Sequence, residues 1–323
     1  METGSGKGFR FTGAGVGGSI MIDIFVLGTS GMTPLPHRHL CSCLVRQNSN
    51  YCLIDAGEGT QVALKKASLS LKKINYLLLT HYHTDHIGGL PGLLASMANS
   101  EKTDTLTIVG PKGLNNVVDA AKRMVSRLPF RIKTIEITEG NQSLKLDSFV
   151  IKPFMVDHKT PCFGYQFQLS RAGRFSEELA RQNNVPEEIW SEIQQKNIVR
   201  YNGRIYTQDL IMDIPRKGLK FVYVTDTRLC ESMRVAAKGA DLMICEGMYY
   251  ELPKTGNAAN NYHMTMIEAA SLAASSGVKE MILTHFSPSI IDPTIYSDRL
   301  HGICKNITIG TDGMVRTLLY KED

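Results

Sequence analysis

The sequence has no long apolar run and no strong excess of charge. No stretch approaches the roughly 20 apolar residues that a membrane-spanning helix needs, and the N-terminus lacks the apolar block of a secretory signal. The net charge of +5 is mild for 323 residues, so it permits a polyanionic partner without requiring one. These absences predict a soluble, cytoplasmic protein with no membrane partner.

The seven cysteines lack the paired C-x-x-C spacing of a thiolate zinc site. Their odd number and scattered positions also give no indication of a disulfide framework. We therefore expect most of them to be small buried apolar residues in a reducing compartment.

The first twenty residues carry seven glycines and almost no periodic apolar pattern. Residues 13–18 superficially resemble a nucleotide-binding glycine loop, but no strand precedes them and no helix follows. We expect residues 1–20 to be a disordered leader or tag, with Met21 as a candidate natural start.

From Ile22 onward, short apolar runs that indicate buried strands alternate with amphipathic helical segments. This alternation predicts an α/β fold for residues 21–323, and 43% hydrophobic residues suffice for a large core. The clearest strand candidates are Ile22–Leu27, Tyr51–Ile54, Tyr76–Leu79, Leu106–Val109, Phe221–Val224, Leu242–Cys245 and Met281–Leu283.

The alternation breaks between about residues 171 and 219. This stretch is polar, contains the one tryptophan, Trp190, and carries two pairs of adjacent glutamates. We expect an inserted arm that projects from the core.

The residues that carry chemistry are concentrated just after an apolar strand. Three imidazoles and one carboxylate fall within six positions: His81, His83, Asp85 and His86. One histidine alone is more often structural than a ligand, but four such groups together favour a metal site, because zinc accepts neutral imidazole and carboxylate. The glycines that follow allow a tight turn before a helix begins. Alternation along the turn can direct the first two histidines at one metal and the last two groups at a second.

The pattern His-x-His-x-Asp-His resembles the metallo-β-lactamase superfamily, whose fold is an αββα sandwich of two mixed sheets flanked by helices. Within it, three runs resemble the ribonuclease Z family: residues 28–31 leading to Pro34 and Arg38, residues 55–61, and residues 88–94. The resemblance covers the chain from Met21 to the C-terminus.

The resemblance implies two Zn²⁺ ions per subunit, with Mn²⁺ as an alternative. One ion is expected on His81, His83 and His158, the second on Asp85, His86 and His285, with Asp226 bridging them. Without the resemblance we would interpret Asp226 as an aspartate that forms a turn or caps a helix.

The resemblance also implies which residues catalyse. Asp85 would accept a proton from the attacking water while binding metal, and His263 would protonate the leaving oxygen, with Glu246 orienting its imidazole. The alternative is structural, with His263 capping a predicted helix at Met266–Ala274 and Glu246 partly buried. Arg38 and Thr60 are expected to contact substrate.

The predicted activity is zinc-dependent cleavage of the 3′ trailer of precursor tRNA by a homodimer. In ribonuclease Z the arm grips tRNA with a lysine-rich stretch, whereas here it carries Glu187, Glu188 and Glu192, which would repel a phosphate backbone. Two alternatives therefore stay open. The first is a zinc phosphodiesterase for small or cyclic nucleotides, and the second is an RNA-binding or assembly protein that has lost activity.

Overall fold

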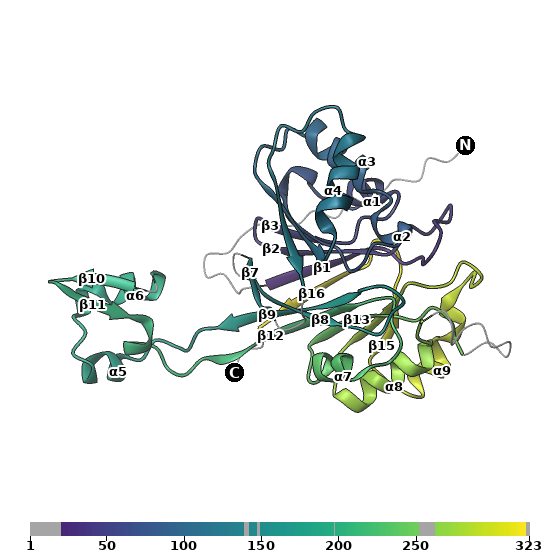
Figure 1. Cartoon of the computed structure of the whole chain (residues 1–323). Helices are drawn as coiled ribbons and strands as arrows, with labels where there is room; N and C mark the ends of the chain where they lie inside the picture. The colour runs from purple at the N-terminus through teal and green to yellow at the C-terminus, as the bar shows by residue number, and fades with distance from the viewer. Residues whose placement is uncertain (1–20, 139–141, 147–148, 197, 252–261, 321–323) are drawn as a thin grey trace, which may run out of the picture.

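Two seven-stranded β-sheets form the centre of the molecule (Figure 1). The computed structural model describes residues 21–138, 142–146, 149–196, 198–251 and 262–320, so the expected leader at residues 1–20 lies outside the described residues. The first sheet has the order β16-β1-β2-β3-β4-β5-β6 and the second the order β15-β14-β13-β12-β9-β8-β7. Both sheets are mixed, because each joins antiparallel pairs on one side to parallel pairs on the other.

The strands of the first sheet are β1 (Met21–Gly28), β2 (Ser42–Gln47), β3 (Asn50–Ile54), β4 (Ile74–Leu78), β5 (Leu106–Pro111), β6 (Ile132–Ile137) and β16 (Val315–Leu319). Those of the second sheet are β7 (Leu144–Leu146), β8 (Phe149–Met155), β9 (Phe163–Arg171), β12 (Arg216–Val224), β13 (Leu242–Glu246), β14 (Met281–Thr284) and β15 (Ile307–Ile309). Each of the seven apolar runs predicted as a strand lies in one of these, apart from Leu79, which follows β4.

Helices cover the outer face of each sheet. Buried apolar side chains therefore form three layers, one between the two sheets and one between each sheet and its helices. Strand β1 shows the principle, since Ile22, Ile24 and Val26 face the layer between the sheets, while Phe25 and Leu27 face the helical layer. The covering helices are α1 (Thr60–Lys66), α3 (Leu90–Asn99) and α4 (Leu114–Arg123) on the first sheet, and α7 (Glu231–Ala237), α8 (Met266–Ser276) and α9 (Ser297–His301) on the second. The predicted αββα sandwich is confirmed.

Helix α8 begins and ends where local chemistry requires. Thr265 and Glu268 form a capping box at its start, each side chain bonding to the other's backbone N–H. Gly277 ends it in the left-handed conformation, at φ 64°. The helix predicted at Met266–Ala274 therefore extends to Ser276.

Residues between β9 and β12 form a projecting arm, at the left of Figure 1. Its elements are α5 (Glu177–Gln182), α6 (Trp190–Gln195), β10 (Ile198–Tyr201) and β11 (Arg204–Thr207). The arm has an apolar cluster of its own, which includes Ile189, Ile193 and Val199. Trp190 packs within the arm, where its ring lies 5.3 Å from that of Phe175 and its Nε1 donates to the Val185 carbonyl.

Short 3-10 turns lie at Leu71–Lys73, Glu187–Ile189, Gln208–Leu210 and Pro293–Tyr296. No helix in the described part of the chain is long and apolar enough to cross a membrane.

Candidate metal centre

Loops at one edge of the sandwich bring together all seven side chains predicted as ligands. In the first sheet, β4 leads into residues 79–83 and α2 (Thr84–Ile87). In the second, the contributing loops follow β8, β12 and β14. Two groups result, and within each group the potential ligand atoms lie within 4.8 Å of one another. The groups are His81, His83, His158 and Asp226, and Asp85, His86, Asp226 and His285.

Asp226 belongs to both groups, and its two oxygens face different histidines. Its Oδ1 lies 3.1 Å from Nε2 of His86 and 3.1 Å from Nε2 of His285. Its Oδ2 lies 3.7 Å from Nε2 of His81 and 3.9 Å from Nε2 of His158. This is the arrangement expected of a carboxylate that bridges two cations.

The donor set fits metal ions. Nε2 of His86 and Nε2 of His285 are buried and have no hydrogen-bond partner among the described residues. A buried polar nitrogen without a partner costs about 1–3 kcal/mol, and coordination of a cation would remove that cost. Imidazole and carboxylate together suit zinc and other transition metals.

Electrostatics within the centre also favour a cation. Burial lowers the pKa of His81 to about 2, so its imidazole is neutral and able to bind metal. Burial opposes ionisation of Asp226, but the nearby charges of His285 and His86 hold the pKa of that carboxyl well below its ordinary value. For His86, burial is outweighed by the carboxylates of Asp226 and Asp55, which raise its pKa well above the usual range. The carboxylates therefore attract positive charge to this site.

Asp55 orients His86 through the ring nitrogen that faces away from Asp226. This fully buried carboxylate accepts a hydrogen bond from Nδ1 of His86 at 2.8 Å and from the backbone N–H of Thr80 at 2.8 Å. The Thr80 hydroxyl in turn lies 3.0 Å from Nδ1 of His81. Such contacts fix which ring nitrogen faces a metal. The sequence analysis missed this role, and the available signal was an aspartate at the end of an apolar strand.

The backbone is strained at the centre. Asp226 and His285 have φ values of 42° and 59°, in the left-handed region that costs non-glycine residues about 1–3 kcal/mol. The segment after the four candidate ligands of the first sheet also packs closely on the β3–α1 loop, because a Cβ added to Gly89 would lie 2.0 Å from the carbonyl oxygen of Gly57. Only glycine fits at that contact.

Asp85 and His263, the two residues predicted to move protons, both lie at the centre. Oδ2 of Asp85 accepts a hydrogen bond from the backbone N–H of Met32 at 2.9 Å. Nδ1 of His263 lies 3.0 Å from Oε2 of Glu246, which is fully buried. Glu246 is held by the backbone N–H of Thr227. Since Nδ1 donates to Glu246, Nε2 of His263 is the nitrogen left for a substrate.

Arg38 and Thr60 are buried beside the centre. Nη2 of Arg38 donates to the backbone carbonyls of Ser287 and Ile290. The Thr60 hydroxyl donates to the carbonyl of Gly57 at the start of α1. These bonds give both side chains a role in holding loops, and contact with substrate stays a prediction.

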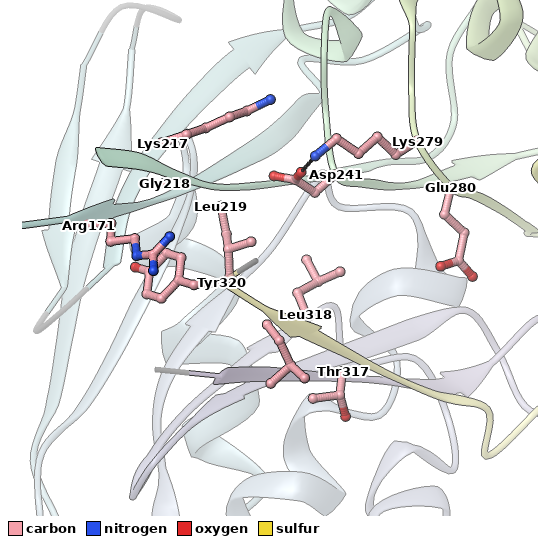
Figure 2. A pocket seen from close by; sticks show the side chains of 11 residues that line it. Arg171, Lys217, Gly218, Leu219, Asp241, Lys279, Glu280, Thr317, Leu318 and Tyr320 are labelled. Carbon is pink, nitrogen blue, oxygen red and sulfur yellow. Dashed lines mark hydrogen bonds and ion pairs between the residues drawn. The ribbon is translucent and has the colours of Figure 1, made fainter. Parts of the chain in front are cut away.

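A separate cavity of about 500 Å³ lies at the root of the arm (Figure 2). Its lining comes from the opposite ends of β12, β13 and β14 to those that carry the metal centre. Arg171 lies over the ring of Tyr320 at 5.1 Å, and Lys279 forms an ion pair with Asp241. This cavity is therefore not part of the metal centre.

Comparison with known proteins agrees with this geometry. Residues 22–170 match the family model for the anti-Pycsar protein Apyc1, and residues 203–286 match the β-lactamase superfamily domain. The chain is 45% identical over 303 residues to ribonuclease Z of Agathobacter rectalis, which covers 94% of this chain and all of that protein. It is 44% identical to ribonuclease Z of Lachnoclostridium phytofermentans, with the same coverage.

Solved structures show the same fold. The metallo-β-lactamase fold protein YhfI from Bacillus subtilis matches with a TM-score of 0.66 and 18% identity, covering 92% of this chain and 99% of that one. The short form of human tRNase Z matches with a TM-score of 0.64 and 23% identity, covering 91% of this chain and 98% of that one. The fold is therefore shared by proteins of widely differing sequence.

Proposed function

The chain belongs to the ribonuclease Z family of the metallo-β-lactamase superfamily, and on that premise we propose that it hydrolyses the phosphodiester that joins the 3′ trailer to precursor tRNA. The observation that carries the proposal is the pair of four-residue clusters that share Asp226. The adjacent His263 and Glu246 pair supports it, because cleavage of RNA expels an oxygen that needs a proton.

We propose that the centre binds two Zn²⁺ ions, with Mn²⁺ as a substitute. One would lie on His81, His83 and His158, the other on Asp85, His86 and His285, and Asp226 would contact both. Bound metals supply activation of the attacking water and neutralise charge on the phosphoryl oxygens.

Asp85 is placed to take the proton of the attacking water. Burial opposes its ionisation, but the imidazoles of His285 and His86, whose Nε2 atoms lie 3.5 and 3.4 Å from its Oδ2, hold the pKa of its carboxyl well below the ordinary range. The carboxylate is therefore charged at neutral pH. The backbone N–H of Met32 fixes one of its oxygens, which leaves the carboxylate in a defined orientation.

His263 completes the reaction at the leaving group. Its Nδ1 is held by Glu246, so the imidazole can carry a proton on Nε2 and pass it to the 3′ oxygen as the bond to phosphorus breaks. Its side chain is 11% exposed, which gives a substrate access to the ring.

The arm lies at the far end of β12 from the metal centre of its own chain. It joins β12 at Arg216, while the metal centre follows the other end of the same nine-residue strand. A strand of that length spans roughly 30 Å. We therefore propose a homodimer in which each arm holds tRNA for the partner's centre.

A phosphodiesterase for small or cyclic nucleotides is the second candidate. It is favoured by the acidic helical part of the arm, which carries Glu177, Glu178, Glu187, Glu188 and Glu192. Lys196 forms an ion pair with Glu192, whereas Arg200 and Arg204 lie in the β10–β11 hairpin, where they supply positive charge that RNA could contact.

The deciding experiment pairs two substrates. A 5′-labelled precursor tRNA with a 3′ trailer is incubated with the protein and Zn²⁺ or Mn²⁺, beside bis-p-nitrophenyl phosphate. We expect a discrete cut next to the discriminator base and turnover of the ester. Turnover of the ester with intact tRNA would contradict the proposal and favour the small-substrate phosphodiesterase.

A further inference from the structure

The side chain of Arg228 joins two segments that carry the metal centre. Arg228 follows Asp226 by two residues, and its Nη1 donates to the backbone carbonyl of His263 at 2.6 Å. The same guanidinium binds the carboxylate of Glu268 through Nη1 at 3.1 Å and Nη2 at 2.5 Å. Its side chain is 24% exposed, so these bonds are only partly shielded from water.

Glu268 is itself fixed by the start of α8. Its Oε2 accepts from the backbone N–H of Thr265 at 2.9 Å, and its own N–H donates to the Thr265 hydroxyl at 3.1 Å. The carboxylate therefore caps the helix and binds Arg228 at once. This arrangement gives the guanidinium a fixed partner, Glu268, on the helix that begins just after His263.

The backbone beside Arg228 is tied to a third segment. The N–H of Arg228 donates to the carbonyl of Asp157 at 2.8 Å, and the N–H of Asp157 donates to the Thr227 hydroxyl at 3.1 Å. Asp157 precedes His158, one of the proposed ligands. Residues 226–228 thus connect the segments that carry Asp226, His158 and His263.

His263 depends on these contacts because it lies outside any helix or strand, directly after Tyr262 at φ 58°. Its ring is held at Nδ1 by Glu246, and its backbone carbonyl is held by Arg228. Two separated attachment points define the direction of Nε2. A guanidinium suits this task, since its planar fork can bind a carboxylate and a carbonyl together.

We propose that Arg228 is a positioning residue that, with Glu268, aims Nε2 of His263 at the leaving oxygen. The inference rests on the proposed function, in which His263 gives that oxygen a proton while the bond from phosphorus to the 3′ oxygen breaks and the water oxygen bonds to phosphorus. The ribose oxygen of RNA is a poor leaving group and needs the proton. The nitrophenolate of the aryl ester leaves as a stable anion without it.

The test compares Arg228→Met, Arg228→Lys and Glu268→Gln with wild type on both substrates, with bound metal measured by elemental analysis. We expect Arg228→Met to lower kcat on precursor tRNA about 100-fold, in the range typical of lost general acid catalysis. KM for tRNA, kcat on the aryl ester and metal per chain should stay close to the wild-type values, because loss of an interaction made only in the transition state lowers kcat without raising KM. Arg228→Lys, which keeps one cation, should recover part of the rate.

Glu268→Gln separates the charged pair from the fold of α8. The amide oxygen can still accept the capping hydrogen bond, whereas the interaction with Arg228 loses the negative charge of its partner. Arg234→Met is the matched control, since this arginine lies on α7 and its side chain has, within the described ranges, only a 4.0 Å pair with the exposed Glu231. Equal losses on both substrates, or loss of metal, would overturn the inference and assign Arg228 a structural role. A wild-type chain that hydrolyses the ester but not tRNA would instead overturn the proposed function, and the inference with it.

Discussion

Asp55 and Asp226 are buried carboxylates with different tasks at the same centre. Asp226 presents Oδ1 to Nε2 of His86 and Nε2 of His285, which have no hydrogen-bond partner among the described residues. Its Oδ2 faces Nε2 of His81 and Nε2 of His158, so the two oxygens are directed as in a bridging ligand. Asp55 instead contacts the far side of one imidazole and the backbone of Thr80. Residue type alone does not separate these roles, whereas the direction of each oxygen does.

Replacing Asp55 by asparagine should weaken metal binding without unfolding the chain. An amide accepts a weaker hydrogen bond from Nδ1 of His86 and tolerates the φ of 61° found here. Loss of such an outer contact typically lowers metal affinity about 10- to 100-fold, which competition with a chelator would measure. Glu58→Gln, an exposed acid three residues along, is the control, and unchanged affinity in Asp55→Asn would contradict the role assigned to Asp55.

Replacing Asp85 by alanine should abolish hydrolysis of both precursor tRNA and bis-p-nitrophenyl phosphate. The carboxylate is both proposed ligand and proton acceptor, so a loss of about 10³-fold or more in kcat is expected. The fold should stay intact, and the melting temperature should fall by no more than it does on removal of metal, because the side chain lies at the surface of the centre rather than in a core layer. A variant with near-normal turnover would refute the assignment of the site.

At the scale of elements, β12 connects the two functional parts of the chain. Arg216 at its start adjoins the arm, and Asp226 follows its end. The arm closes on itself at its root, where the N–H of Asp213 donates to the carbonyl of Arg174 at 2.8 Å. Because the arm has an apolar cluster of its own, we expect its removal at this point to leave the core of the two sheets intact.

Replacing residues 174–213 by a short Gly-Ser turn should therefore separate binding from chemistry. We expect kcat on the aryl ester to stay within about twofold of wild type and KM for precursor tRNA to rise at least about tenfold, because the phosphate contacts of the arm are lost. Circular dichroism and both kinetic assays would check this. If tRNA cleavage were undiminished, the arm would have no part in substrate binding.

The element pattern was predictable because it is local. Runs such as Leu242–Cys245 are apolar on both faces, as strands buried between a helical layer and a second sheet must be. The start of α8 was predictable for the same reason, since Thr265 and Glu268 form a capping box within four residues. Which strands pair, and in what order, depends on contacts between residues far apart in the sequence.

At the scale of the whole molecule, the centre joins the two sheets. His81, His83, Asp85 and His86 follow β4 of the first sheet, whereas His158, Asp226 and His285 follow strands of the second. A metal bound by both sets would connect the two halves of the sandwich. Binding to the folded state alone stabilises it in proportion to the logarithm of free metal.

Removing metal with a chelator should lower the melting temperature. At free metal about 100 times the dissociation constant, the stabilisation is about 2.7 kcal/mol, which corresponds to roughly 5 °C for a chain of this size. Differential scanning calorimetry with and without EDTA would measure the shift, and added Zn²⁺ or Mn²⁺ should restore it. Identical melting with and without chelator would show that no metal bridges the sheets.

The sequence by itself determined the α/β class, half of the strands of the two large sheets and the first four candidate ligands, because these depend on residues near one another in the chain. It also carried the resemblance that named His158, Asp226, His285, Glu246 and His263. Only the tertiary structure decided that both oxygens of Asp226 face histidines, that Asp55 holds His86 and that Arg228 holds His263. The contact between Asp226 and His81 joins residues 145 positions apart (226 − 81), and spacing along the chain carries no information about direction in space.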